Sequence, residues 1–312
     1  MTEPRRPART PDGRAWARFC RNKPAVIGGV FLAGLILLVL VWPWAATYRP
    51  EVRYAEQFQP PDAKHWFGTD VHGRDVLTRV LHGARVSLMV GVVGAGVALG
   101  IGVTWGAVAG YVGGRVDSVM MRTVDVLYSL PSIVFVMVLI TTLNQGAKAW
   151  FGRMPPPLGP VLADASPLLF LFVGLGAVSW LTMARIVRGQ VLTLRTRGFV
   201  DASRAMGATH ARILWHHILP NVWGIVVVYL TLTVPAVILY ESFLSYLGFG
   251  VQPPMASWGS LVAEGAGQLN TLRPYWWLIV FPASVLVTTL LALSFLGDGL
   301  RDAFEPKGGG VS

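Results

Sequence analysis

Residues Gly198 to Asn221 read GFVDASRAMGATHARILWHHILPN, a polar stretch between two long apolar runs. We predict two short helices that turn at Gly207, because glycine adopts backbone conformations closed to other residues. Thr209 suits the N-cap of the second helix, and we expect Pro220 to end the hairpin before the next apolar run. A polar hairpin held between two membrane spans would present a docking surface to a soluble partner.

Composition places the chain in a lipid bilayer. A mean hydropathy of +0.54, with 53% hydrophobic and 13% charged residues, excludes an ordinary soluble domain. A helical span needs about 20 mainly apolar residues. Six stretches qualify, so we predict an all-α membrane protein with six transmembrane helices: residues 25–46, 87–111, 126–143, 167–184, 223–240 with an extension to 250, and 275–297.

The basic residues indicate the orientation. With a cytoplasmic N-terminus, the inside segments hold 7, 2, 6 and 2 lysines and arginines, and the outside segments hold 6, 2 and 1. This bias favours both termini and the polar hairpin on the cytoplasmic side. The first span is too long for a cleavable signal peptide, and Trp42-Pro43-Trp44 after it resembles an interfacial anchor.

The net charge of +10 could indicate a nucleic-acid partner. Membrane lipid is the better partner, because the excess lies in the N-terminal tail and the cytoplasmic loops, next to anionic headgroups. We therefore predict no nucleic-acid partner. Cys20, the one cysteine, can form no disulfide within the chain.

Catalytic and cofactor motifs are missing from the sequence. It has no phosphate-binding loop for ATP. His216 and His217 are adjacent, so their side chains diverge by about 100° on a helix, and metal binding is the less favoured reading. Ser242 and Ser245 have no evident base nearby. We predict no catalytic residue, no metal and no cofactor bound by this chain.

Four other features lead to structural expectations. Residues 74–85 alternate as an amphipathic helix for the outer interface, and glycines at positions 102, 106 and 110 predict close helix packing, with helix sliding during transport as the alternative. Arg122 and Asp125 are spaced to pair on one helix. The outer loop 144–164 is too rich in proline for regular structure.

Glu241 is the only acid well inside a predicted span. Because charge within a membrane is costly, the residue is a functional candidate. Two roles stay open, lining of the translocation path and an interhelical hydrogen bond. The following segment, with Pro253, Pro254 and Ser257-Trp258-Gly259, predicts an outer re-entrant or interfacial element near the mouth of that path.

The polar hairpin resembles the EAA loop of ABC-importer permeases. That pattern has Glu-Ala-Ala, three residues, Gly, nine residues, then Ile-x-Leu-Pro. Here Asp201-Ala202-Ser203, Gly207 and His217-Ile218-Leu219-Pro220 keep the spacing in full. The ending HILPN is typical of the peptide/nickel branch. The runs FGTD-x-x-GRDVL at 67–77 and ESFLSYLGFG at 241–250 are similar to the same family, over nearly the whole chain.

The resemblance identifies a C-type permease subunit of dipeptide, oligopeptide or nickel importers. It implies the type I ABC-importer permease fold with a cytoplasmic EAA coupling helix, in a bacterial plasma membrane. It also implies a homologous second permease, two ATP-binding cassette ATPases that hold ATP and Mg, and an extracytoplasmic substrate-binding protein. The residues implied to couple to the ATPases are Asp201, Ala202, Ser203, Gly207, Ala208, Thr209, Ile218, Leu219 and Pro220.

The chain divides accordingly into four parts. We expect a cytoplasmic tail at 1–24, a first span with an outer loop at 25–86, a permease core at 87–302 containing the coupling loop 198–221, and a tail at 303–312. A channel or ion-coupled transporter and a membrane-embedded enzyme are the alternatives from other classes. Short peptides are the expected cargo, because spans with little fixed charge offer nickel no shell of imidazole and sulfur ligands. Nickel or another small solute is the alternative within the family.

Overall fold

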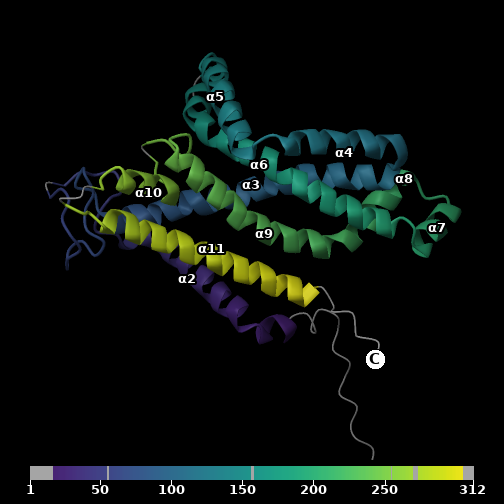
Figure 1. The fold of residues 1–312 in the computed structure, drawn as a ribbon, viewed down its shortest axis with the longest axis horizontal. Helices are drawn as coiled ribbons and strands as arrows, with labels where there is room; N and C mark the ends of the chain where they lie inside the picture. Colours follow the sequence, from purple (N-terminus) through teal and green to yellow (C-terminus); the bar gives the residue numbers. More distant parts are fainter. Residues whose placement is uncertain (1–16, 55, 156–157, 254, 270–272, 305–312) are drawn as a thin grey trace, which may run out of the picture.

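The computed structural model describes residues 17–54, 56–155, 158–253, 255–269 and 273–304, and there the chain is helical apart from turns and one isolated bridge between Thr69 and Asp75. The helices form one elongated bundle (Figure 1). In chain order they are α2 (Lys23–Ala45), α3 (Val76–Val112), α4 (Gly114–Ser129), α5 (Ser132–Phe151), α6 (Leu158–Leu194), α7 (Gly198–Ala205), α8 (His210–Arg212), the π-helical turn η1 (Ile213–Ile218), α9 (Leu219–Tyr246), α10 (Trp258–Ala266) and α11 (Trp277–Phe304).

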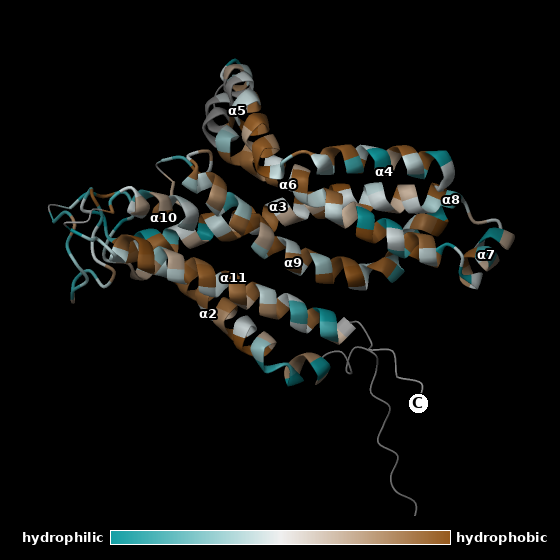
Figure 2. Cartoon of the chain, in the orientation of Figure 1, coloured by the Kyte–Doolittle hydropathy of each residue, from teal (hydrophilic) through white to brown (hydrophobic). Residues whose placement is uncertain are grey.

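Among the described residues, five helices are long and apolar enough to cross a membrane, and a bent pair counted as one span makes six. Figure 2 shows the apolar residues running along these helices. The bent pair is α4 with α5, whose axes differ by 91°. The third span, expected as one helix over 126–143, is therefore broken. Pro131 is the cause, because the residue before a proline avoids the helical region, and Leu130 is extended at φ −79° and ψ 140°.

Glycines hold α3 close to α6. A Cβ atom on Gly102 would lie 2.6 Å from the Cβ of Met183, and one on Gly110 would lie 2.8 Å from the carbonyl oxygen of Arg188. A Cβ on Gly106 would overlap the carbonyl oxygen of Ala184. The predicted packing role of this stripe is confirmed, because no larger residue would fit between the two backbones.

Two expectations about the outer side were wrong. Residues 76–85 form no separate interfacial helix but the first turns of α3, where Arg79 is buried. The Asp75 side chain caps this helix by accepting from the Thr78 N–H at 2.8 Å. The proline-rich segment 144–164 is also mostly helical, because α5 continues to Phe151 and α6 starts at Leu158; residues 156 and 157 lie outside the described part.

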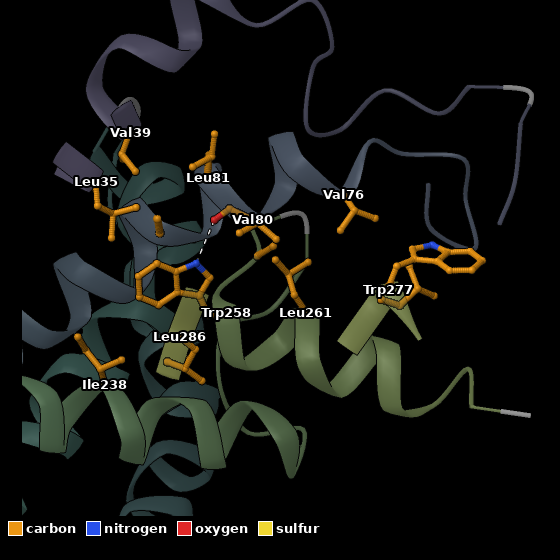
Figure 3. Packing of buried hydrophobic residues seen from close by; sticks show 13 residues of the cluster. Leu35, Val39, Val76, Val80, Leu81, Ile238, Trp258, Leu261, Trp277 and Leu286 are labelled. Carbon is orange, nitrogen blue, oxygen red and sulfur yellow. Dashed lines mark hydrogen bonds between the residues drawn. The ribbon is translucent and has the colours of Figure 1, made fainter. Parts of the chain in front are cut away.

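The end of the bundle that carries α10 is built around Trp258, the first residue of that helix. Its side chain is fully buried, and its Nε1 donates to the carbonyl of Val80 at 3.0 Å (Figure 3). Ser257 caps α10 by accepting from the Ser260 N–H. The segment expected to be re-entrant or interfacial is thus a short helix packed against α3, α9 and α11. Pro254 lies outside the described residues.

A charged network joins the loop between α2 and α3 to α10. Arg79 Nη1 lies 2.8 Å from Asp70 Oδ2 and 2.7 Å from Glu264 Oε2. Arg74 also pairs with Asp70, at 2.7 Å. Nearby, the backbone N–H of His65 donates to Asp62 and holds the pKa of that exposed carboxyl below its usual value.

The helices α2 and α11 pack together along one side of the bundle (Figure 1). A Cβ on Gly28 would lie 2.7 Å from the carbonyl oxygen of Ala292. Asn22, at the start of α2, donates to Asp302 near the end of α11. The two ends of the described chain therefore lie close together, toward the end of the bundle that carries α7 rather than α10.

Candidate functional site

The hairpin between α7 and α8 projects from the end of the bundle (Figure 1). Gly207 has a φ of +79°, a left-handed conformation that glycine adopts readily. The Thr209 side chain accepts from the Arg212 N–H at 3.3 Å and caps α8. The Ala208 N–H donates to the Ser203 carbonyl, which closes the turn. The predicted turn at Gly207 and the predicted cap at Thr209 are both confirmed.

Pro220 does not end the second helix, so that expectation was wrong. The chain continues without a break from α8 through η1 into α9, and Pro220 occupies the first turn of α9. Proline is tolerated there because the pairing shifts to the wider π-helical register, in which the Leu219 N–H donates to the carbonyl of Leu214. The Asn221 side chain donates to the carbonyl of His217 at 2.6 Å.

The predicted coupling residues divide into a buried set and an exposed set. Ser203, Ile218 and Leu219 are buried, and Ala208 is half-buried. The aliphatic members of this set belong to a core cluster with residues of α3 and α6. These residues therefore fix the hairpin to the bundle. The exposed set, which a partner could touch, is Asp201, Ala202, Gly207, Thr209 and Pro220.

Two exposed apolar residues lie at the two ends of α7, on either side of Asp201 and Ala202, and sequence reasoning missed them. Met206 is 80% exposed at the end of α7, and Phe199 is 40% exposed in its first turn. Asp201 and Arg204 lie between them on the same short helix and pair at 3.2 Å. The missed signal was a large apolar residue at each end of a helix only eight residues long, Phe199 in its first turn and Met206 directly after it, because so short a helix cannot bury every face.

Polar contacts fix the base of the hairpin to α3. The Tyr111 hydroxyl lies 2.9 Å from Nδ1 of His210. Arg195 donates to the carbonyl of Gly110 at 3.1 Å. The junction of η1 and α9 packs against the same part of the bundle through Ile218 and Leu219. A displacement of the hairpin would thus be passed to α3, α6 and α9.

The expected pair between Arg122 and Asp125 does not form. Asp125 instead pairs with Arg185 of α6 at 2.8 Å. Asp117 pairs with Arg188 through both carboxylate oxygens. The acids of α4 face α6, since α4 packs alongside it, so the arginines of α6 are nearer than those on the same helix. Neither pair could be predicted from residue spacing within one helix, because the partners lie on different helices.

Glu241 is completely buried between helices. Its carboxylate accepts from the Ser245 hydroxyl at 2.6 Å and from the Ser87 hydroxyl of α3 at 3.4 Å. The backbone N–H of Trp258 donates to Ser87 at 3.1 Å. Of the two roles left open for Glu241, the interhelical hydrogen bond is therefore present. Across the described residues, no group of three His, Cys, Asp or Glu side chains could hold a metal ion.

Two family models match parts of this chain. Residues 102–308 match the family of binding-protein-dependent transport system inner membrane components, and residues 10–61 match the N-terminal transmembrane domain of oligopeptide transport permease C. The chain is 43% identical to the oligopeptide transport system permease protein OppC of Haemophilus influenzae, over 93% of this chain and 86% of the relative. It is 43% identical to the dipeptide transport system permease protein DppC of Bacillus subtilis, over 97% of this chain and 88% of the relative.

A solved structure shares the fold. An inward-facing form of the MetNI methionine ABC transporter aligns with a TM-score of 0.51 at 20% identity, over 74% of this chain and 96% of that chain. The helical fold of this chain is therefore that of type I ABC-importer permeases.

Proposed function

Because the chain belongs to the family of binding-protein-dependent transport system inner membrane components, we propose that it is the permease subunit of an ATP-driven importer of dipeptides or oligopeptides. It is a multi-pass, non-catalytic transport subunit of an inner-membrane transporter. The main evidence for a peptide cargo is similarity to two relatives that are peptide permeases by name. This chain is 43% identical to each of them over more than nine tenths of its length. The small number of charged residues in its spans supports the same cargo.

The importer would contain four kinds of subunit. This chain pairs with a homologous second permease, two ATPase subunits hold ATP and Mg, and an extracytoplasmic binding protein delivers the substrate. The hairpin supports the ATPase contact, because α7 lies at the end of the bundle (Figure 1) and carries exposed polar and apolar residues. Membrane lipid surrounds the spans, and nucleic acid has no part.

Within this scheme the hairpin passes motion from the ATPases to the path. The exposed side chains of Asp201, Ala202 and Thr209 contact an ATPase, and Gly207 sets the angle of the contact. The buried Ser203, Ile218 and Leu219, with half-buried Ala208, transmit the motion to the bundle. Met206 joins the contact surface, because a side chain 80% exposed at this point is available to an apolar pocket on a partner.

Both termini and the hairpin lie on the cytoplasmic side in our proposal. The bias of basic residues supports it, as does the closeness of Asn22 and Asp302. After replacement of Cys20 by serine, a cysteine at Ala208 should react with a membrane-impermeant maleimide only in inverted vesicles, and one at Trp66 only in intact spheroplasts. Reversed labelling would refute this orientation.

Glu241 affects transport rate rather than selectivity. Its carboxylate joins α9 to α3 through Ser87, so it acts on how these helices move. The Glu241→Gln variant keeps the size of the side chain, and we expect a lower uptake rate with an unchanged order of preference among peptides. A changed order would place Glu241 in contact with the cargo.

The cargo itself is tested by uptake in cells that lack this subunit. Restoring the chain should restore uptake of labelled di- to pentapeptides, in an ATP-dependent manner. If the deletion leaves peptide uptake unchanged but abolishes nickel accumulation, the proposal of a peptide cargo is refuted. The proposal that the chain belongs to an ATP-driven importer is then unaffected. Copurification with an ATPase separates an importer from an ion-coupled transporter or a channel.

A further inference from the structure

A groove of about 320 Å³ opens between α4, α5, α6 and α9. Seven of the eleven residues that line it carry hydroxyl groups, and none is Asp, Glu, Lys, Arg or His. Three of the hydroxyls come from α9, on Tyr229, Thr233 and Tyr240. Hydroxyl groups that face lipid tails find no external hydrogen-bond partners, so a groove with this many hydroxyls faces water or another polar surface.

The hydroxyls can both accept and donate hydrogen bonds. Ser179 and Thr233 donate to carbonyls of their own helices at 3.0 and 2.7 Å, which leaves their oxygen lone pairs for an external donor. Among the described residues, the hydroxyls of Tyr229 and Tyr240 have no hydrogen-bond partner, so each is also free to donate. The groove therefore suits a ligand that carries donors and acceptors in alternation.

The break between α4 and α5 lies at the same groove. Tyr128 and Ser132, on either side of the break at residues 130 and 131, both line it. Helix ends leave backbone N–H and C=O groups without partners. At membrane depth such backbone is tolerated only where it is buried in protein or lines a water-filled cavity. Leu130 and Pro131 are exposed, so the break indicates water in the groove.

Charge lies just beyond one end of the groove. Thr182 of α6 lines it, and Arg185 follows one turn later, in the direction of the coupling hairpin. The Arg185 guanidinium lies 4.3 Å from the ring centroid of Tyr128 and pairs with Asp125 at 2.8 Å. The groove is thus an uncharged segment that ends at a neutralised ion pair.

We propose that this groove is the wall of the translocation path on this subunit and that it binds the backbone of a peptide in transit. This inference rests on the proposed peptide cargo. Eleven residues of α9 separate Tyr229 from Tyr240, a rise of about 16 Å. That length matches about five residues of extended peptide. A peptide backbone supplies one donor and one acceptor per residue, and an uncharged wall does not discriminate among side chains.

Glu241 lies outside this groove although it follows Tyr240 in sequence. Neighbouring residues on a helix point about 100° apart, and Glu241 faces Ser87 of α3. The groove therefore replaces Glu241 as the surface that meets the cargo.

The first test introduces charge into the groove of the complete reconstituted transporter. Thr233→Asp should raise uptake of Ala-Lys-Ala relative to Ala-Glu-Ala by at least about tenfold, whereas the matched neutral variant Thr233→Asn should leave the ratio near that of the wild type. An unchanged ratio in Thr233→Asp would overturn the proposal. Copurification of all subunits shows whether each variant assembles.

The second test removes hydroxyls without adding charge, and so remains informative if the aspartate variant does not assemble. The combination Tyr229→Phe, Thr233→Val and Tyr240→Phe should lower peptide uptake by about tenfold or more, because each lost hydrogen bond weakens binding severalfold. ATPase activity stimulated by the loaded binding protein should persist. The matched control is Thr141→Val, on an exposed hydroxyl of α5 outside the groove, and it should transport normally.

A labelling experiment identifies what occupies the groove. With Cys20 replaced by serine, Thr233→Cys should react with a bromoacetyl tetrapeptide during turnover, and Thr141→Cys should not. Cross-linking of Thr233→Cys to the second permease instead of the peptide would show a subunit interface and overturn the proposal. Failure of the wild-type transporter to take up any peptide would refute the proposed cargo, whereas wild-type uptake with unaffected groove variants would refute only the groove.

Discussion

Replacing Gly207 tests whether the angle of the coupling hairpin matters. Its φ of +79° is a conformation that costs an L-residue about 1–2 kcal/mol. A Cβ atom placed on Gly207 would meet nothing within 4 Å, so the penalty is purely conformational. Asparagine adopts this conformation more readily than the other non-glycine residues. Alanine has the full conformational cost of about 1–2 kcal/mol, and for the β-branched valine the cost rises to about 3 kcal/mol.

These energies predict a graded loss of coupling. Each 1.4 kcal/mol changes an equilibrium constant tenfold. The population of the observed turn, relative to other conformations of the hairpin, should therefore fall about tenfold in Gly207→Ala and about a hundredfold in Gly207→Val. Gly207→Asn should lie nearest the wild type. Insertion into the membrane should be normal in all three, because the hairpin is exposed at this point. Transport should decline in the same order.

The assay is ATPase activity stimulated by the loaded binding protein in vesicles that contain the complete transporter. Basal hydrolysis and subunit copurification are measured in parallel to separate a coupling defect from a folding defect. Full stimulation in Gly207→Val would refute the reasoning, since it would mean that the hairpin either does not couple or does not need this turn. A loss that is equal in all three variants would refute the conformational explanation alone.

Three further outcomes follow from the packing. Gly106→Ala should lower the midpoint of thermal unfolding of the complex, since its new Cβ would overlap a backbone carbonyl of α6. The control Gly100→Ala should keep or raise this midpoint, because a Cβ there would meet nothing within 4 Å. Equal midpoints in the two variants would contradict the close packing of α3 and α6. Arg79→Met should cost about 3 kcal/mol, because buried Asp70 loses one of its two arginines, and an unchanged midpoint would show the network to be dispensable. Pro220→Ala restores an N–H donor at the π-helical turn, so it should stabilise the helix yet lower stimulated ATPase activity, and unaltered stimulation would show that the turn has no part in coupling.

The sequence alone determined the class of the protein, the five unbroken spans among the described residues and the turn of the hairpin. Apolar runs of about 20 residues indicate membrane-spanning helices. The positions of Gly207 and Thr209 predict a turn and a helix cap through local backbone preferences. The spacing of Asp201, Gly207 and Pro220 also indicated the family before any contact was known. These features depend on neighbours in the chain, which a sequence displays directly.

The tertiary structure decided which residues meet across helices. Asp125 pairs with Arg185 rather than Arg122 because a helix 60 residues away in sequence lies alongside, and Glu241 faces Ser87 across a separation of 154 residues. Likewise, the groove unites hydroxyls from four helices, at sequence positions that run from 128 to 240. Pro220 remained within a helix because a shift in hydrogen-bond register accommodated it. Such outcomes depend on which faces pack together, and packing is settled only when the helices assemble.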